Sequence, residues 1–235
     1  IERGRRQIDK LTLCRLADTF QLNQTERQHF WEVAYDLQGF LFAEEVSEEE
    51  TADLLADMAQ ELSNVYAPAL IYNGLYQLIA ANSAWLTLSR LNGKSLRKKI
   101  NMLEIFFDPQ YEYRATFSAR WNLLASLSTR YLKLLTFPFK YHPEYEAVLA
   151  RLNQFPDFDF YWNLADEVYN ENETPPKRAF TYNHVLCGEI SYVIYAEKRR
   201  TAVGTVYMTV LQSQDDETAD AFLELAAEPT AQIFL

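Results

Sequence analysis

The stretch "AFTYNHVLCGEISYVIYAEKRRTAVGTVYMTVLQSQ", residues 179–214, decides the fold class of this chain. Apolar and polar residues alternate along it with a period of two, a pattern typical of strands that bury one face. Turn signals interrupt the alternation at Cys187-Gly188 and again within residues 197–202. The stretch therefore predicts three consecutive strands of an antiparallel meander. The helix that follows, from Asp215, is expected to bury Phe222, Leu223 and Ala226.

A second pair of strands is predicted far upstream, in "APALIYNGLYQLIAANSAW" at residues 67–85. Its two apolar runs flank Asn73-Gly74, and an Asn-Gly pair between such runs is a strong hairpin signal. A helix is expected to begin near Asn82. Five antiparallel strands interrupted by a large helical insert predict an α+β fold.

The insert between the two groups of strands is rich in aromatic residues. The chain holds 15 Phe, 15 Tyr and 4 Trp, and they crowd into residues 106–162. A helix is expected from about Tyr113 to Leu135, and prolines divide the segment that follows it. Two interpretations stay open. The aromatics either form a core because each buries a large area, or line a gap between insert and sheet that suits an apolar ligand.

Helices are also predicted before the first strand. Two short ones are expected at residues 11–20 and 23–38, and a longer one after the capping pair Ser47 and Glu50. The longer helix has an acidic outer face, and its apolar stripe consists of Leu54, Met58 and Leu62. It either links two domains or packs on the second one.

Charge and cysteine content narrow the function classes. The 235 residues include 33 acidic and 22 basic side chains, and the net charge of −11 argues against nucleic-acid binding by the chain as a whole. Residues 1–16 are nevertheless basic, and a second basic run, "KSLRKK" at 94–99, is interpreted as a solvated loop or helix end. No apolar run approaches the length of a membrane helix, and the two distant cysteines fit a reducing cytoplasm.

Motifs of catalysis and metal binding are weak. The six glycines form no phosphate-cradling loop, and no nucleophile elbow is present. His184 and Cys187 have a ligand-like spacing, but adjacent inward positions at a hairpin end explain a single such pair equally well. We therefore predict no catalytic residue, no metal site and no required cofactor.

The start of the chain resembles the last part of a phage-repressor-type (Xre) helix-turn-helix domain. The resemblance rests on "IERGRR" at residues 1–6, followed by "LCRLADTFQLNQTERQHFWEVA" at residues 13–34. It implies that the recognition helix ends on the first stretch, that the preceding helices lie before residue 1, and that DNA is a partner of the complete domain. Arg3, Arg5 and Arg6 are then the expected phosphate contacts.

Most of the remaining chain, from about residue 68 to 225, resembles the MmyB-like ligand-binding domain that follows such DNA-binding domains in bacterial regulators. Its landmarks, in the right order, are "ANSAW" (81–85), "NMLEIFFDP" (101–109), Trp121 after Arg114, "FDFYW" (158–162) and "HVLCGEI" (184–190). Two features depart from the family pattern. Val185 replaces a usual proline, and the spacing from Arg114 to Trp121 is one residue longer than usual.

This resemblance implies a PAS-like fold and a bacterial transcription regulator that senses a buried apolar ligand, with a fatty acid as the leading candidate. The chain then divides into residues 1–38 (end of the helix-turn-helix domain), 39–65 (acidic linker helix) and 66–235 (PAS-like domain), in a cytoplasmic homodimer. The expected lining residues are Trp85, Phe106, Trp121, Leu124, Trp162, Tyr182 and His184. A carboxylate head would meet Tyr182, His184 or an arginine such as Arg120 or Arg130.

Other functions stay open at this point. A PAS-like module that works by partner contact would use the same aromatics only as core. A sensor that binds haem or flavin is a further alternative. An enzyme fits less well, because no catalytic motif supports it.

Overall fold

The computed structural model describes residues 10–22, 27, 30, 34, 47–136, 139, 143–167, 179–201, 204–226 and 230–234. The helix predicted at residues 11–20 is present as α1 (Lys10–Thr19). The other N-terminal features, Arg3, Arg5, Arg6 and most of the helix predicted at 23–38, lie outside the described residues. The division of the chain at residues 38 and 65 likewise stays a prediction.

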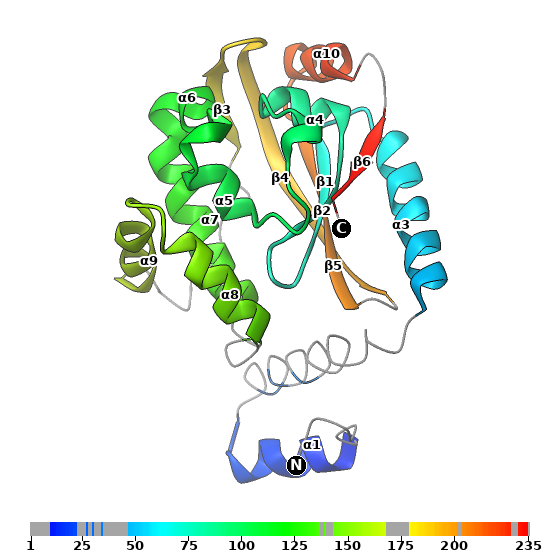
Figure 1. The fold of residues 1–235 in the computed structure, drawn as a ribbon, viewed down its shortest axis with the longest axis vertical. Helices are drawn as coiled ribbons and strands as arrows, with labels where there is room; N and C mark the ends of the chain where they lie inside the picture. Colours follow the sequence, from blue (N-terminus) through cyan, green and yellow to red (C-terminus); the bar gives the residue numbers. More distant parts are fainter. Residues whose placement is uncertain are drawn as a thin grey trace.

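Strands in the described part of the chain form one antiparallel sheet in the order β3-β4-β5-β1-β2-β6 (Figure 1). They are β1 (Ala69–Asn73), β2 (Leu78–Asn82), β3 (Phe180–His184), β4 (Gly188–Thr201), β5 (Gly204–Ser213) and β6 (Ala231–Ile233). Without β6, the order is β2-β1-β5-β4-β3 with helices inserted between β2 and β3, as in a PAS-like sheet. The predicted α+β class is confirmed.

The sheet contains one strand more than the five predicted. β6 pairs with β2 through Ile233 opposite Ala80, and the Phe234 N–H donates to the Ile79 oxygen at 2.7 Å. This strand is only three residues long and follows a proline in the sequence. It therefore offers too few positions for an alternating pattern to be seen.

The second turn of the meander also lies later than predicted. Residues 197–201 are predicted to form a turn, but they continue β4 and pair with β5, from Glu197 opposite Met208 to Thr201 opposite Gly204. Most side chains of this extension are exposed on both faces. The hydrophobic alternation therefore disappears while the strand pairing continues.

Helices cover the sheet. The α-helices after α1 are α3 (Glu48–Ser63), α4 (Ser83–Leu88), α5 (Met102–Phe107), α6 (Tyr113–Phe117), α7 (Trp121–Thr136), α8 (Pro143–Leu152), α9 (Phe158–Glu167) and α10 (Asp216–Leu225). Short 3₁₀ turns are η2 (Gly93–Ser95), η3 (Pro109–Tyr111) and η4 (Ser118–Arg120). As predicted, Asn82 begins α4, where its side chain accepts the Trp85 N–H at 2.9 Å. None of the helices described is long and apolar enough to cross a membrane.

Two predictions about helices are wrong. The helix expected from Tyr113 to Leu135 is broken, because Ser118 has a positive φ of 42° between α6 and α7. Unlike glycine, serine does not signal a positive φ in a sequence. The helical spacing of apolar residues therefore continues across the break between α6 and α7. In α10, Phe222 is buried as expected, but Leu223 is 51 % exposed. A helix buries positions one turn apart, so neighbours at i and i+1 seldom share the buried stripe.

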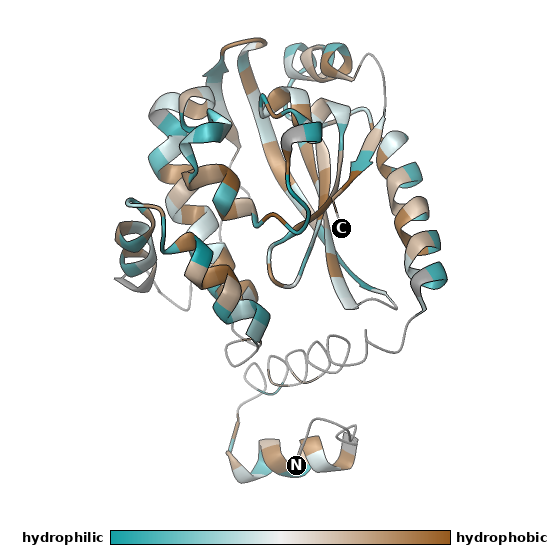
Figure 2. Cartoon of the chain, in the orientation of Figure 1, coloured by the Kyte–Doolittle hydropathy of each residue, from teal (hydrophilic) through white to brown (hydrophobic). Residues whose placement is uncertain are grey.

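The two faces of the sheet have different covers (Figure 1). On one face α3 packs with Met58 and Leu62 against Ile71 and Ile79 of the central strands. The helices between β2 and β3 cover the other face. Figure 2 shows apolar residues concentrated on the central strands between these covers. Of the two roles left open for α3, packing on the sheet is therefore the one observed.

Candidate functional site

Helix α5 directs its two consecutive phenylalanines to different partners. A capping box fixes the helix start, where Asn101 Oδ1 accepts the Leu103 N–H at 2.9 Å and Glu104 Oε1 accepts the Asn101 N–H at 3.2 Å. With the start fixed, Phe106 contacts a ring of α6, whereas Phe107 contacts rings of α7 and α9. The buried aromatics therefore form two groups, named here the sheet-facing layer and the helix layer.

The sheet-facing layer runs from α5 through α6 to β3 and β4. The ring centroids of Phe106 and Tyr113 are 4.6 Å apart, and those of Tyr113 and Phe117 are also 4.6 Å apart. Phe117 lies 5.2 Å from Tyr182 on β3, and Tyr182 lies 6.2 Å from Tyr192 on β4. Such pairs stabilise a fold by about 0.5–1.5 kcal/mol each beyond the area they bury. This layer occupies the boundary between insert and sheet.

The helix layer lies inside the insert. The Trp121 ring is 5.7 Å from Phe107, and the Arg114 guanidinium lies 4.2 Å above its face in a cation–π contact. On α9, Phe158 and Trp162 are 5.3 Å apart. Lys133 of α7 lies 4.2 Å over the Trp162 ring, so Trp162 joins α9 to α7, whereas Trp121 joins α7 to α5.

A group of tyrosine hydroxyls lies between α7 and the centre of the sheet. The hydroxyls of Tyr72 on β1 and Tyr131 on α7 are 2.9 Å apart, and Thr209 Oγ1 donates to the Tyr72 hydroxyl at 3.4 Å. The ring of Tyr76 packs edge-on against Tyr72, with centroids 4.9 Å apart. Burial raises the pKa of both Tyr72 and Tyr76 far above the ordinary value for tyrosine. These hydroxyls therefore stay neutral.

The Tyr182 hydroxyl differs from this group. It is buried and makes no hydrogen bond of ordinary geometry with any described residue. Burial raises the pKa of Tyr182 most, followed by the nearby hydroxyls of Tyr192 and Tyr113, and a loose side-chain contact with the Tyr192 hydroxyl acts in the same direction. A buried hydroxyl without a partner costs about 1–3 kcal/mol, and such a group points to a bound water or ligand. Within the described residues, Thr129 Oγ1 on α7 is in the same condition.

His184 joins the end of β3 to α4. Its Nδ1 accepts the Leu186 N–H at 3.2 Å, so Nε2 carries the proton and donates to the Leu88 oxygen at 2.8 Å. Burial lowers the pKa of the imidazole, which the folded protein therefore holds neutral. With both nitrogens engaged, His184 is not free to bind a metal ion or a carboxylate. Among the residues that the structure describes, no cluster of His, Cys, Asp and Glu is suited to a metal.

The seven predicted lining residues thus have different surroundings. Phe106 and Tyr182 belong to the sheet-facing layer, and His184 lies at its edge, 6.0 Å from the Tyr182 ring. Trp121 and Trp162 belong to the helix layer. The structure therefore places the rings of Phe106 and Tyr182 in one layer and the two tryptophans in the other, and Trp121 Nε1 joins the layers by donating to the Phe106 backbone oxygen at 3.3 Å.

The remaining members of the predicted set lie in the core or at the surface. Trp85 of α4 and Leu124 of α7 are buried in the same core as the two layers. Of the candidate partners for a carboxylate, Arg120 is exposed and Arg130 is half-buried. The sheet-facing layer itself carries the hydroxyls of Tyr113, Tyr182 and Tyr192, which stay neutral because burial raises their pKa.

Sequence reasoning missed most of the tyrosines that face the interior. Among them are Tyr72, Tyr76, Tyr113, Tyr131 and Tyr192. A signal existed for Tyr192, because it alternates with Ile190 on the inward face of β4. Tyr113 and Tyr131 are placed by the break before α7, which the sequence does not show.

The elements around these layers match a known family. The model of the MmyB-like transcription regulator ligand binding domain matches residues 48–226, from the first turn of α3 to the residue after α10. The chain belongs to this family. In this MmyB-like domain the sheet-facing layer lies between the sheet and the helices inserted after β2, well inside the matched region. A search of curated proteins found no match to the chain.

Proposed function

We propose that this chain belongs to a bacterial DNA-binding transcription regulator whose PAS-like domain binds an apolar small molecule, with a fatty acid as the leading candidate. Membership of the MmyB-like family supports the general role, a ligand-binding domain of a transcription regulator. The observation that carries the finer proposal is the buried Tyr182 hydroxyl, which makes no hydrogen bond of ordinary geometry with a described residue, has the Tyr192 hydroxyl nearby, and sits among aromatic rings.

The chemistry of the sheet-facing layer suits an acyl chain with a polar head. About ten methylenes buried at ~0.8 kcal/mol each contribute roughly 8 kcal/mol before ordering costs are subtracted. The Tyr182 hydroxyl stays protonated, so it would donate a hydrogen bond to a carboxylate. A hydrogen bond to a charged group contributes about 1.5–3 kcal/mol. The hydroxyls of Tyr113 and Tyr192 lie nearby and would complete the surroundings of the head.

A ligand in this layer has to separate rings that now touch. Helix α6 is the element best suited to move, because it is five residues long and is bounded by positive φ values at Glu112 (29°) and Ser118 (42°). Its ring contact with the sheet is the one between Phe117 and Tyr182. Displacement of α6 would shift the balance between two arrangements of the domain, and in a dimer it would reposition the DNA-binding heads.

The closeness of the aromatic rings supports one alternative. If the two layers are only core, the domain is a PAS-like module that acts through partner contacts. A haem sensor has less support, because both nitrogens of His184 are already hydrogen-bonded.

The proposal is tested by urea unfolding with added lauric or palmitic acid. At a free acid concentration of 100 Kd, binding should raise the free energy of unfolding by about 2.7 kcal/mol. The methyl ester of the same acid is the matched control, since it keeps the chain and loses the charge. It should stabilise the protein less. Absence of stabilisation by either acid would support the module without a ligand.

A further inference from the structure

We infer that a groove on the surface of the domain is a second ligand site, one that binds a phosphoryl or similar oxyanion group of a small soluble molecule. The groove has a volume of about 490 Å³, within the range of pockets that hold small molecules. Its polar lining consists of Gln77, Arg97, Lys98, Lys99, Glu144 and Arg151. This inference does not depend on the proposed apolar ligand.

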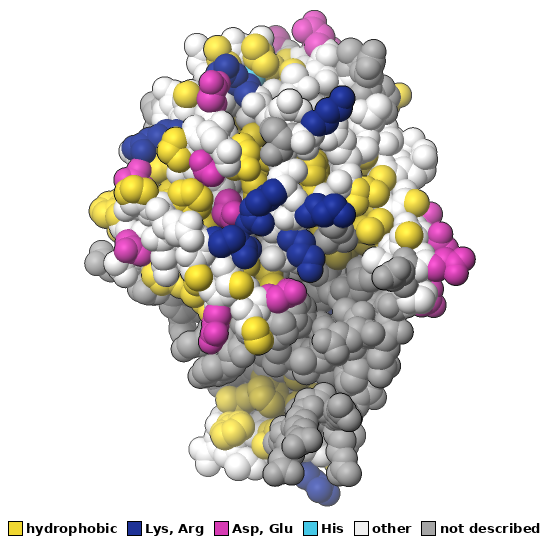
Figure 3. Space-filling model, viewed as in Figure 1, with side chains coloured by type: hydrophobic (Ala, Val, Ile, Leu, Met, Phe, Trp, Pro, Cys, Tyr) yellow, Lys and Arg dark blue, Asp and Glu magenta, His cyan; other side chains and the backbone are white. Residues whose placement is uncertain are grey.

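The lining is strongly cationic in a chain whose net charge is −11. Figure 3 shows that Lys and Arg side chains gather near the centre of the face of the molecule drawn there. The lining contains one carboxylate, Glu144, whose Oε1 lies 3.8 Å from Lys99 Nζ. This ion pair is exposed to solvent, so it contributes little to the free energy of folding. Lys98 Nζ pairs with no carboxylate in the part of the chain that is described. Net positive charge therefore remains available to an anion.

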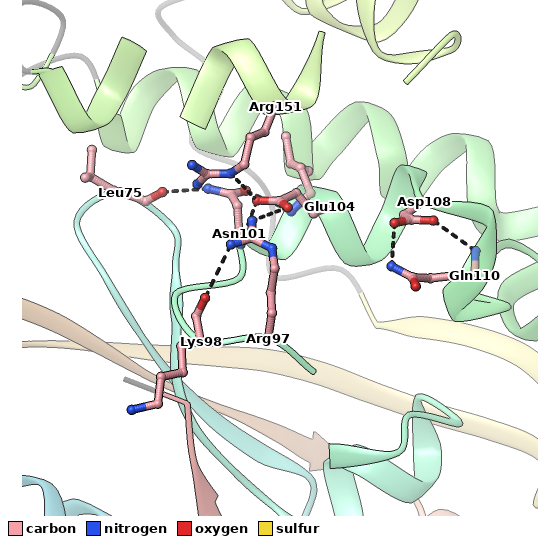
Figure 4. A network of polar contacts seen from close by, with 9 residues as sticks. Leu75, Arg97, Lys98, Asn101, Glu104, Asp108, Gln110 and Arg151 are labelled. Atoms are coloured by element: carbon pink, nitrogen blue, oxygen red, sulfur yellow. Dashed lines mark hydrogen bonds and ion pairs between the residues drawn. The ribbon is translucent and has the colours of Figure 1, made fainter. Parts of the chain in front are cut away.

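A buried carboxylate holds the two arginines of the groove in place (Figure 4). Glu104 is 6 % exposed and pairs with Arg97 through one oxygen and with Arg151 Nε, at 3.2 Å, through the other. The second oxygen also accepts the Asn101 N–H, so the carboxylate itself is fixed. Because both guanidinium groups are ordered before a ligand arrives, binding loses less side-chain entropy.

The lining of the groove includes the side-chain amide of Gln77. Asn73 Oδ1 accepts the N–H groups of Leu75 and Gln77, so Asn73 Nδ2 is the donor in its 2.9 Å bond to the Gln77 side chain. The atom of Gln77 that accepts this bond is therefore Oε1. Its Nε2 group makes no hydrogen bond to a described residue, and Gln77 lines the groove. Every polar group of the lining except Glu144 is thus a donor.

The origin of the lining residues in three segments favours a small oxyanion over a nucleic acid. Gln77 lies in the β1–β2 connection, Lys98 and Lys99 precede α5, and Arg151 lies on α8. A compact anion reaches all three segments at once, whereas the phosphates of a duplex follow its surface and would meet only the exposed lysines. A bound anion would link α8, which is part of the helical insert, to the connection between strands β1 and β2.

The test is isothermal titration calorimetry of the whole chain with inorganic pyrophosphate, at ionic strength kept constant with chloride. Saturable 1:1 binding is expected for the unchanged protein. Lys98→Gln should weaken affinity by about tenfold, the loss of one hydrogen bond from a charged donor. Gln77→Glu should also weaken it, because the carboxylate keeps the bond to Asn73 and replaces the amide donor. Lys94→Gln is the matched control, an exposed lysine of the same loop outside the groove, and should change affinity less than twofold.

Three results would overturn the inference. One is the absence of saturable binding by pyrophosphate. Another is equal weakening by Lys94→Gln and Lys98→Gln, which would indicate general screening. The third is Lys98-dependent binding of duplex DNA without binding of pyrophosphate. The exposed position of Lys98 keeps the Lys98→Gln variant folded, and its circular dichroism spectrum should match that of the unchanged chain.

Discussion

Replacing Tyr182 by Phe separates a ligand-binding role of its hydroxyl from a structural one. The substitution removes one buried oxygen and keeps the ring that lies 5.2 Å from Phe117 and 6.2 Å from Tyr192. Because that oxygen makes no hydrogen bond of ordinary geometry with a described residue, its loss should raise the free energy of unfolding without ligand by about 1 kcal/mol. Affinity for lauric acid should fall by about tenfold, since a hydrogen bond to the carboxylate is lost.

Two measurements on the same sample check this prediction. Urea unfolding followed by circular dichroism gives the stability, and titration with lauric acid gives the affinity. Tyr131→Phe is the matched control, because it removes a hydroxyl that does bond, to Tyr72. That control should lower stability by about 1 kcal/mol. If Tyr182→Phe lowers stability and leaves the affinity unchanged, the hydroxyl is structural and the reasoning is refuted.

Three further predictions concern the role of Trp121 in the core, the pH dependence of stability, and the ion pair that links α3 to the sheet. Trp121→Ala should lower the free energy of unfolding, measured in urea, by about 3–5 kcal/mol and should change fatty-acid affinity little. A small loss of stability with a large loss of affinity would show instead that Trp121 lines the ligand pocket. Burial lowers the pKa of His184, so stability should fall as pH drops through about 6.5, where the unfolded chain takes up a proton. His184→Gln should flatten that decline in unfolding curves recorded from about pH 7.5 to 5.5, and an unchanged slope would contradict the assignment. Arg199→Ala removes the half-exposed link to Glu61 of α3 and should destabilise by up to about 1 kcal/mol at low salt; an effect that high salt does not reduce would argue against an ionic contribution.

Elements with a local chemical signal could be predicted from the sequence. The alternation in residues 179–214 and the Asn73-Gly74 turn predict strands that the structure contains. The same is true of the capping groups, since Asn82 begins α4 and Ser47 with Glu50 forms a complete box on α3. In each case the stabilising contact lies within a few residues of the signal, so the sequence carries it directly.

Features set by long-range contacts could not be predicted. The three residues of β6 are a strand only because β2 offers them an edge. The break at Ser118 is invisible because no glycine marks its positive φ. "KSLRKK" at 94–99 reads as a solvated loop until α8 brings Arg151 beside it, held by Glu104.

The candidate site shows the same limit. Composition shows that the insert is rich in aromatics, but it does not distinguish Phe106 from Phe107, which differ in the direction that a six-residue helix gives them. The predicted lining includes three tryptophans that lie within landmarks of the family resemblance. The unpartnered hydroxyl of Tyr182 becomes visible only once β3, β4 and α6 are assembled.

Native mass spectrometry of the purified chain tests the central claim most directly. The account predicts a population carrying one noncovalent adduct with the mass of a fatty acid, and complete conversion to that form when lauric acid is added. The adduct should be weaker in Tyr182→Phe and retained in Tyr131→Phe. A well-folded chain that stays empty in the presence of the acid would contradict the claim that this domain is a sensor of apolar ligands.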